Sequence, residues 1–569
     1  MKRVSLLVAA AFSLVAGGCG KKEEPPAGST LGPDEIPLRI AQVCPGDANC
    51  PAGGDGKLQV GVGVRDISPT IEPFTDSNGN RVWDFGEPYT DLNGNGQYDA
   101  YWMANDTGRQ ILGVHDPIWV RCYALRQDQS TVAHCAVDAI GYFHTELDQI
   151  RADLDPALGV DLVMTSATHD HSAPDTLGIF GPDDTSSGYK PDWMRWVRAQ
   201  AVSAISEAVR TMRPAKMSIG AIATEEGPNH DMTHTIDDSR DPVVIDNMLH
   251  VMQFDGADDG KPIVTVVNWT AHPDSQSHSN RYVSSEFPNY LRQDVERHTG
   301  SPVVYVSGSV GGQVGPGRVR AITEDGQELP CGERSYRFIQ AWGKYIARFA
   351  NMAFDKRTEV PAPKLAFRTT RVNFHVDNIF YHTAFALKIL PRQLFGYDKS
   401  KPMLRDENGD NAPLIDSELV YLTLGPAAIQ TMPGELLPEL FIGGYDGSRR
   451  GTWEPFVHKG PIYDSCDPTR IKNEGDYPAP ADVTKAPKPP YLFDLMDGEP
   501  QHRMIFALTM DMLGYIVPAY DFYLDPVFPY LHEPPGDQHY EETNSLGPRA
   551  EAEMVGTARQ LVLSARAKK

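Results

Sequence analysis

Apolar stretches that run directly into histidines place the strongest constraint on this chain. Val163 and Met164 close one such stretch, and His169 and His171 follow in Thr168-His-Asp-His-Ser-Ala-Pro174. An extended backbone would send both imidazoles to one face and the intervening Asp170 to the other. Neutral imidazole is the commonest protein ligand for zinc, so the pattern predicts a metal site. Hydrogen-bonded surface histidines produce the same pattern and remain the alternative.

Later strands repeat this arrangement. An apolar strand that starts at Ile263 delivers His272, and a strand at residues 303–306 runs into the glycine-rich stretch 307–313. Glycines there would let the backbone approach a ligand closely. Glu435 stands just past another strand. Because sites in open α/β sheets gather beyond the carboxyl ends of strands, these positions are candidates for a site.

Strands and helices alternate along the chain, which is typical of the α/β class. Strands are expected at residues 58–66, 118–126 and 131–140, and helices at 146–154, 191–212, 335–356 and 549–565. The predicted fold is therefore α/β, with mixed β-sheets flanked by helices and a metal site at the C-terminal ends of strands.

An internal repeat at residues 76–99 is inserted into this pattern. Oxygen-bearing side chains at alternate positions of a tight loop suit a hard cation such as calcium, as in dockerin and thrombospondin repeats, and we expect a structural role. The alternative is an array of solvated Asn-Gly turns. The second copy lacks a closing acid, because Trp102 stands in that place. The expected calcium ligands are Asp76, Asn78, Asn80, the carbonyl of Val82, Asp84 and Glu87 in the first copy, and Asp91, Asn93, Asn95 and Asp99 in the second.

Charge and the N-terminus bear on partners and location. A formal net charge of −24 argues against a nucleic-acid partner. Met1-Lys-Arg, a short apolar run and Ala16-Gly-Gly-Cys19 resemble a lipoprotein signal. We therefore expect export and a lipid-modified Cys19 that tethers the protein to a bacterial membrane, at the outer membrane or facing the periplasm. Ordinary cleavage that leaves a free Cys19 is the alternative. Residues 20–57 are expected to be a flexible tether.

Of the seven cysteines, six remain when Cys19 is set aside, an even number that suits an oxidising compartment. Cys44 and Cys50 would close a small loop, and Cys122 and Cys135 stand symmetrically about a turn, as across a hairpin. Cys331 and Cys466 are the remainder by elimination, and buried free thiols fit that last pair equally well.

Several motifs together resemble the catalytic domain of the neutral, non-lysosomal ceramidases. They occur in the order of that family and cover most of the chain from residue 58 onward. The motifs are Gly61-Val-Gly-Val-Arg-Asp-Ile, His115-Asp-Pro-Ile-Trp-Val-Arg, Thr168-His-Asp-His-Ser-Ala-Pro174, Asn268-Trp-Thr-Ala-His-Pro273, Pro433-Gly-Glu435, Gly514-Tyr515 and His539-Tyr-Glu541.

The resemblance implies a set of roles for particular residues. Zinc would be held by His169, His272, Glu435 and Tyr515, and His171, Tyr540 and Arg240 would face the reacting carbonyl. Zinc can activate water for attack on that carbonyl, so no serine nucleophile is needed. Two departures from the family pattern, Asp170 and Ala173, alter the surroundings of the metal and the substrate mouth.

The predicted function is that of a zinc-dependent amidohydrolase that cleaves an N-acyl amide of ceramide or another lipid. The alternatives are a zinc esterase on the same scaffold and a non-catalytic, calcium-stabilised surface-binding protein. The hydrolase domain would span residues 58–569, with a Pro-rich loop at 453–492.

Overall fold

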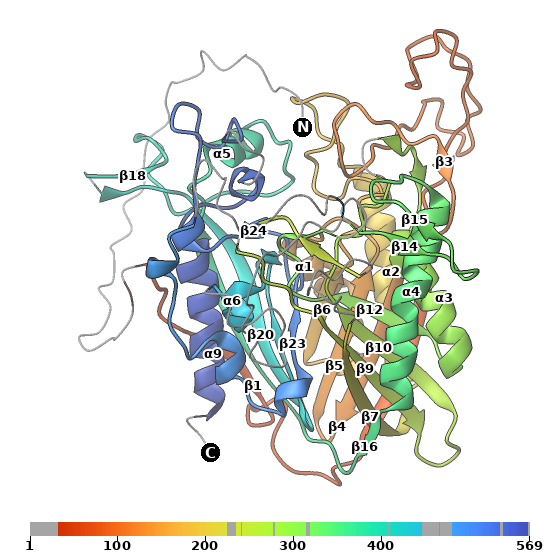
Figure 1. Ribbon diagram of the computed structural model, residues 1–569, viewed down its shortest axis with the longest axis vertical. Coiled ribbons are helices and arrows are strands. Elements are labelled where there is room, and N and C mark those ends of the chain that lie inside the picture. The colour runs from red at the N-terminus through yellow and green to blue at the C-terminus, as the bar shows by residue number, and fades with distance from the viewer. Residues whose placement is uncertain are drawn as a thin grey trace.

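Two mixed β-sheets lie face to face in the computed structural model, and helices cover the outer face of each (Figure 1). Helices α2, α3 and α4 lie against the larger sheet, and α9 lies against the smaller one. The predicted α/β class with mixed sheets flanked by helices is confirmed. The structure describes residues 32, 34–224, 235–240, 242–276, 279–314, 319–407, 409–445, 466, 481–534 and 539–566.

The larger sheet has nine strands in the order β12-β10-β9-β7-β2-β4-β5-β6, with β16 paired to β7. The β5–β6 and β10–β12 pairs are parallel, whereas the other pairs are antiparallel. The strands are β2 (Leu58–Asp66), β4 (Trp119–Gln127), β5 (Ser130–Val137), β6 (Leu162–Ala167), β7 (Arg213–Ala223), β9 (Met248–Gly256), β10 (Pro262–Trp269), β12 (Val303–Ser307) and β16 (Thr358–Val360).

The smaller sheet has five strands in the order β1-β17-β20-β21-β23, and its β21–β23 pair is parallel. Its strands are β1 (Ile40–Cys44), β17 (Leu365–His375), β20 (Leu414–Leu424), β21 (Ala427–Thr431) and β23 (Arg503–Phe506). Short pairs outside the sheets are β3 (Gly113–Val114) with β11 (Tyr282–Val283), β8 (Asp237–Asp238) with β13 (Gln313–Val314), β14 (Ala321–Ile322) with β15 (Glu328–Leu329), β18 (Arg405–Asp406) with β19 (Gly409–Asp410), and β22 (Glu435–Leu436) with β24 (Tyr515–Ile516).

The longer helices occur close to where the sequence predicts them. Residues 551–566 form a π-helical turn (Glu551–Val555) that continues into α9. The helices are α1 (His144–Asp153), α2 (Pro191–Arg210), α3 (Glu286–Thr299), α4 (Tyr336–Asp355), α5 (Ile379–Ala386), α6 (Glu439–Ile442), α7 (Leu492–Leu495), α8 (Tyr540–Thr543) and α9 (Gly556–Arg566). Within the described residues, no helix combines the length and apolar character needed to span a bilayer.

One apolar core joins the facing sheets. Val60 and Val132 of the larger sheet belong to the same buried cluster as Phe367 and Val420 of the smaller one. Strand β5 is buried along its whole length. Such a strand needs an almost continuous apolar sequence, because side chains on both of its faces leave water.

Close packing of α2 explains the Gly-Val-Gly pattern of β2. A Cβ atom on Gly61 would lie 1.9 Å from the carbonyl oxygen of Ala208 in α2, and one on Gly63 would lie 2.2 Å from that of Ala204. Both distances are far below van der Waals contact, so any larger residue would push the helix off the sheet. These glycines serve packing between helix and sheet.

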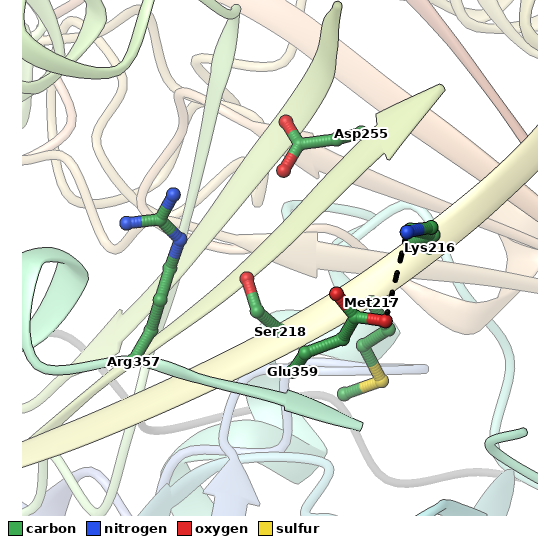
Figure 2. Close-up of a pocket in the computed structure, with 6 residues that line it drawn as sticks. All are labelled: Lys216, Met217, Ser218, Asp255, Arg357 and Glu359. Carbon is green, nitrogen blue, oxygen red and sulfur yellow. Dashed lines mark ion pairs between the residues drawn. The ribbon is translucent and has the colours of Figure 1, made fainter. Parts of the chain in front are cut away.

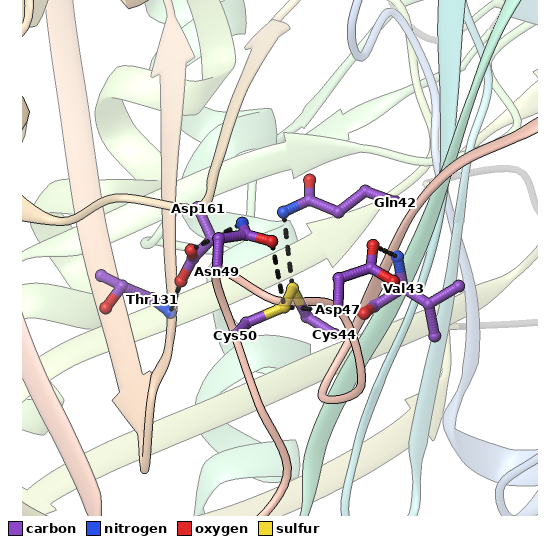
Figure 3. The surroundings of a disulfide bond; sticks show 8 residues. All are labelled: Gln42, Val43, Cys44, Asp47, Asn49, Cys50, Thr131 and Asp161. Carbon is purple, nitrogen blue, oxygen red and sulfur yellow. Dashed lines mark hydrogen bonds between the residues drawn. A yellow bond between two sulfur atoms is a disulfide. The ribbon is translucent and has the colours of Figure 1, made fainter.

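The expected flexible tether over residues 20–57 is wrong for its second half. Residues 40–44 form β1, which pairs with β17, and a disulfide links Cys44 to Cys50 (Figure 3). The Asn49 amide donates to Asp161, whose carboxylate accepts the Thr131 N–H of β5, at 3.1 and 2.8 Å. The strand has only five residues, Ile40-Ala-Gln-Val-Cys44, and polar and Pro-rich sequence flanks it, so the sequence pattern does not reveal it. As an edge strand it needs only one paired side.

The other disulfides match the predicted pairs, Cys122 with Cys135 and Cys331 with Cys466. Cys122 and Cys135 face each other in the β4–β5 hairpin, as their symmetric spacing predicts. The expected signal peptide at residues 1–19, and residues 20–31 of the tether, lie outside the described residues. So does most of the Pro-rich loop at 453–492, of which Cys466 and residues 481–492 are described.

Candidate metal centre

The curl of the larger sheet brings together histidines that are far apart in sequence. Strand β12 at one edge lies near β6 at the other, and the Ser307 hydroxyl donates to the Thr168 carbonyl at 3.0 Å. Strand β10 lies beside β12, so the residues that follow β6 and β10 meet in one place. His169 follows β6 and His272 follows β10, and both are buried.

Each of these histidines is oriented by a backbone carbonyl. His169 Nδ1 lies 2.7 Å from the Ile140 oxygen, and His272 Nδ1 lies 2.9 Å from the Gln313 oxygen. A carbonyl only accepts, so both Nδ1 atoms carry the proton and both Nε2 atoms present a lone pair when the rings are neutral. This is the outer-shell arrangement that fixes metal-ligating histidines.

The backbone at His169 differs from the predicted extended conformation. Its φ is +68°, in the left-handed region. A β-strand therefore ends at Ala167, and His169 turns inward through a conformation that non-glycine residues adopt at a cost. The Asp170 carboxylate accepts the Ser172 N–H at 2.8 Å.

Glu435 and Tyr515 complete the cluster from a parallel pair of short strands. They face each other in the β22–β24 register. Glu435 Oε2 lies 3.1 Å from Nε2 of His169 and 3.1 Å from Nε2 of His272, and the Tyr515 hydroxyl lies 3.1 Å from His272 Nε2. The structure thus brings together all four residues named as zinc ligands.

Glycines behind the cluster make room for these strands. A Cβ on Gly311 would lie 2.7 Å from the Glu435 carbonyl oxygen. The glycine-rich stretch after β12 therefore admits the strand that carries Glu435, whereas the sequence suggested close approach of a ligand.

The chemistry of the cluster fits a cation. Imidazole lone pairs, a carboxylate oxygen and a phenol oxygen converge on one buried point, and without a positive charge such lone pairs repel. Burial raises the pKa of the Glu435 carboxyl, but His169 and His272 outweigh it and lower that pKa. Burial, together with Glu435, holds the pKa of the Tyr515 phenol well above 10. Borderline metals such as zinc accept this mixture of nitrogen and oxygen ligands.

His171 lies beside the cluster and is only half-buried. Its Nε2 is 3.3 Å from His169 Nε2, and single ligand atoms of His169, His171 and His272 lie within 4.8 Å of one another. Burial and the neighbouring His169 and His272 push the pKa of His171 well below 6.5. His171 can therefore act as a third nitrogen ligand or as a neutral group beside a substrate.

Tyr540 borders the cluster, whereas Arg240 does not reach it. The Tyr540 hydroxyl lies 3.1 Å from that of Tyr515. The Arg240 guanidinium is buried against Asp521, Glu541 and Glu542, at 2.6, 3.0 and 3.1 Å. Its expected position facing a reacting carbonyl is therefore wrong, because carboxylates on and near α8 occupy its donors. Arg240 instead fixes the short helix that carries Tyr540.

Neither nearby serine has the partners of a nucleophile. The Ser172 hydroxyl donates to Glu286 at 2.8 Å, and the Ser307 hydroxyl donates to a backbone carbonyl. A serine nucleophile needs a histidine base within hydrogen-bond reach, and these two hydroxyls are engaged elsewhere.

The first predicted calcium loop is exposed, and the acid predicted to close it is Glu87. Asn78 and Asn80 donate to Asp84 at 2.6 and 2.8 Å, and Asp76 accepts the Gly79 N–H at 2.7 Å. Glu87 closes the loop by accepting the backbone N–H groups of residues 77 and 84, at 2.7 and 3.0 Å.

The second loop repeats this geometry, and Glu72 supplies its closing acid. Asn93 and Asn95 donate to Asp99 at 2.6 and 2.8 Å. Glu72 accepts the N–H groups of Leu92 and Asp99, both at 2.9 Å, which are the positions that Glu87 binds in the first loop. The expectation that this loop lacks a closing acid is therefore wrong. Lys190 also pairs with Asp99, which has no counterpart in the first loop.

A longer repeat unit gives a sequence signal for Glu72. Glu72-Pro-Phe-Thr-Asp76 and Glu87-Pro-Tyr-Thr-Asp91 begin equivalent units, and each glutamate closes the loop of the other unit. The units are related by reciprocal hydrogen bonds, from Thr75 N–H to the Pro88 carbonyl and from Thr90 N–H to the Pro73 carbonyl, at 2.8 and 2.9 Å.

A separate hollow lies at the end of the larger sheet opposite to the histidine cluster, and Figure 2 shows the residues that line it. It is bordered by β7, β9 and β16, and Lys216 pairs with Glu359 across it at 3.7 Å. Asp255 of this hollow pairs with Pro262 at the start of β10, whereas His272 follows the end of that strand. The hollow is therefore remote from the histidines. The residues that line it form no metal-binding group among the described residues.

Solved structures of ceramidases share this fold. Neutral ceramidase from Pseudomonas aeruginosa aligns with a TM-score of 0.56 and 13% identity, covering 90% of this chain and 75% of that one. A ceramidase complexed with C2 aligns with a TM-score of 0.55 and 12% identity, covering 90% and 76%. No protein-family model and no curated protein matches the chain. At these identities the likeness shows the fold.

Proposed function

We propose that this protein is a zinc-dependent hydrolase that cleaves an N-acyl amide of ceramide or a similar lipid. The observation that carries the proposal is the convergence of His169, His272, Glu435 and Tyr515 on one buried point. The likeness of fold to ceramidases supports an amide of a lipid as substrate.

His169, His272, Glu435 and Tyr515 would hold the metal in this proposal. Bound zinc supplies a Lewis acid that polarises a carbonyl and lowers the pKa of water. The Ile140 and Gln313 carbonyls keep the imidazoles pointed inward, so little reorganisation is needed on loading.

His171 and Tyr540 are the groups that would contact the substrate. The neutral His171 ring can hydrogen-bond the oxygen on which negative charge develops, and the Tyr540 hydroxyl can donate a proton toward the leaving nitrogen. Arg240 acts through Tyr540, because its ion pairs with Glu541 and Glu542 hold α8 in place.

The test compares metal content and hydrolysis in the parent and in the His169→Ala/His272→Ala variant. We expect about one equivalent of zinc at this centre and ceramide hydrolysis in the parent, and neither in the variant. His298→Ala, at an exposed histidine paired with Asp355, is the matched control and should behave as the parent does. Turnover of esters with no turnover of amides would favour the esterase. Calcium uptake with no turnover of either would favour the surface-binding protein.

We also propose that the protein is exported and tethered to a bacterial membrane by a lipid on Cys19. The disulfides support an oxidising compartment. Labelled fatty acid should be incorporated into the parent and not into Cys19→Ser, and the variant should leave the membrane fraction. Equal labelling of both would refute the anchor.

The loops at residues 76–99 are proposed as structural calcium sites, one per repeat unit. The matched positions of Glu72 and Glu87 support two sites of similar construction. Calcium ions there would neutralise a part of the chain rich in carboxylates and stabilise its turns.

A further inference from the structure

A second histidine-carboxylate cluster lies where α1 meets the smaller sheet. His144 begins α1, and its side chain is fully buried. Its Nδ1 lies 3.1 Å from the Met510 carbonyl oxygen, and its backbone N–H donates to Asp511 at 2.9 Å. The carbonyl can only accept, so Nδ1 carries the proton and Nε2 presents a lone pair in the neutral ring.

That lone pair has no hydrogen-bond partner although it is buried. It faces Asp148, one helical turn further along α1, with Nε2 3.7 Å from Oδ2. Asp416 of β20 completes the group, and one ligand atom from each of the three residues lies within 4.8 Å of the others. A buried lone pair that faces two carboxylates is unfavourable unless a cation lies between them.

Arginines surround the cluster but do not fill its centre. Arg151 and Arg371 bind Asp148 through Oδ1, at 3.4 and 2.5 Å, which leaves Oδ2 toward His144. Arg392 lies 3.9 Å from Asp416 and binds Asp511 at 2.6 Å. Counting Glu418, which binds Arg151 at 2.7 Å, the four carboxylates Asp148, Asp416, Glu418 and Asp511 face three guanidinium groups. One negative charge is therefore left over beside the imidazole.

We propose that His144, Asp148 and Asp416 bind a second zinc ion, separate from the central site. One imidazole nitrogen and two carboxylate oxygens form a ligand set of intermediate softness, which suits zinc better than calcium. The hydrogen bond from Nδ1 to the Met510 carbonyl is the outer-shell contact that such a ligand needs.

The position of this site suggests a structural role. Two ligands come from α1, which also contacts β6 of the larger sheet, and the third comes from β20 of the smaller sheet. The ion would therefore clamp α1 between the two sheets. This proposal does not depend on the hydrolase proposal, because it shares no ligand with the central cluster.

The test is zinc titration of the chelator-treated full chain, with bound metal measured by elemental analysis after dialysis. The parent should hold about two equivalents, and His144→Asn and Asp416→Asn should each hold about one. Asparagine at position 144 can still donate to the Met510 carbonyl while it removes Nε2. Asp416 is half-exposed, with a side chain 43% accessible, so its variant probes the site with little risk to the core. Asp153→Asn, at an exposed residue of the same helix, is the matched control and should keep both ions.

The outcomes separate this proposal from that of the central site. His169→Ala/His272→Ala should lose one equivalent and keep the ion bound by His144. If the parent holds one ion that His144→Asn and Asp416→Asn both retain, the second site is refuted. If the parent holds one ion that only the His144 and Asp416 variants lose, the second site stands and the central zinc fails.

Discussion

The central cluster and the paired loops at residues 76–99, both proposed as metal sites, are built in opposite ways. The central ligands are buried and come from positions spread between His169 and Tyr515, whereas the loop ligands lie within residues 72–99 and are mostly exposed. Carbonyls of the surrounding fold orient the central imidazoles, whereas the loops rely on hydrogen bonds among their own side chains and turns. We infer that the surrounding fold holds the central ligands in position, whereas the loop ligands need a bound ion to hold their positions.

The largest expected effect separates the two sites by activity. Glu435→Gln removes the carboxylate that faces both imidazoles, so amide hydrolysis should fall on the order of 10³-fold or more, since the metal supplies several kcal/mol to the transition state. Glu87→Gln should leave hydrolysis within a few-fold of the parent. Steady-state kinetics on ceramide with elemental analysis measures both. Equal losses of hydrolysis in Glu435→Gln and Glu87→Gln would show that activity does not distinguish the central cluster from the loops.

A smaller effect tests whether Tyr540 contacts the substrate and leaves metal binding to the other residues of the central cluster. Tyr540→Phe removes a hydroxyl that lies 3.1 Å from Tyr515, so kcat should fall on the order of 10²-fold while the zinc content stays unchanged. Tyr523→Phe, at an exposed tyrosine, is the control. Loss of zinc from Tyr540→Phe would make Tyr540 a part of the metal-binding set.

The crossed glutamates of the loops give a third test. Glu72→Gln and Glu87→Gln should each weaken one calcium site on the order of 10-fold or more, and by similar amounts, because the two carboxylates bind equivalent backbone positions. Calorimetric titration of calcium into both variants and into Glu324→Gln, an exposed control, measures this. Normal affinity in Glu72→Gln beside a weakened Glu87→Gln would leave the second loop without its closing acid.

The smallest effect concerns a histidine that lies among hydroxyls instead of carboxylates. His134 contacts Ser166 and Tyr123, and burial lowers its pKa from 6.5 to about 3. Between those values the unfolded chain binds the extra proton, so the free energy of unfolding falls as pH drops below 6.5. His134 should account for about 1 kcal/mol of that fall between pH 7 and pH 5.5.

Urea unfolding of His134→Gln at both pH values measures the His134 contribution. Its stability should change less with pH than that of the parent, whereas His298→Gln, at an exposed histidine, should follow the parent. An unchanged pH dependence in His134→Gln would mean that the pKa of His134 is the same in the folded and unfolded chain, against the lowering that its burial implies.

The two sites also differ in how far the sequence predicts them. Spacing alone predicts the loop ligands from Asp76 to Asp99, because they are neighbours in the chain. Glu72 escapes the loop pattern because it lies outside both loops, and only the longer repeat reveals it. Strand-end placement makes His169, His272 and Glu435 candidates for the site, whereas Tyr515 is implied only by the family resemblance.

Other features depend on the fold itself and leave little trace in sequence. His169 has a left-handed backbone conformation that no sequence pattern predicts. The carbonyls of Ile140 and Gln313 orient the imidazoles through backbone atoms, which the side-chain sequence does not reveal. The family resemblance implies a place for Arg240 at the reacting carbonyl, whereas three acidic groups on and near α8 bind its guanidinium.

Strand β1 has a mechanical consequence for a protein held at a membrane by its N-terminus. Tension from the proposed anchor at Cys19 would first reach residues 34–38, which are held by Arg405 and Gln560. It would then load β1, the edge strand beside β17. Its hydrogen bonds run across the strand direction, so a pull along β1 loads them together instead of one at a time. Behind the strand, the Cys44–Cys50 link and the contact of Asn49 with Asp161 pass the load to the larger sheet. That load would enter the larger sheet at the start of β6, and His169 follows the other end of the same strand.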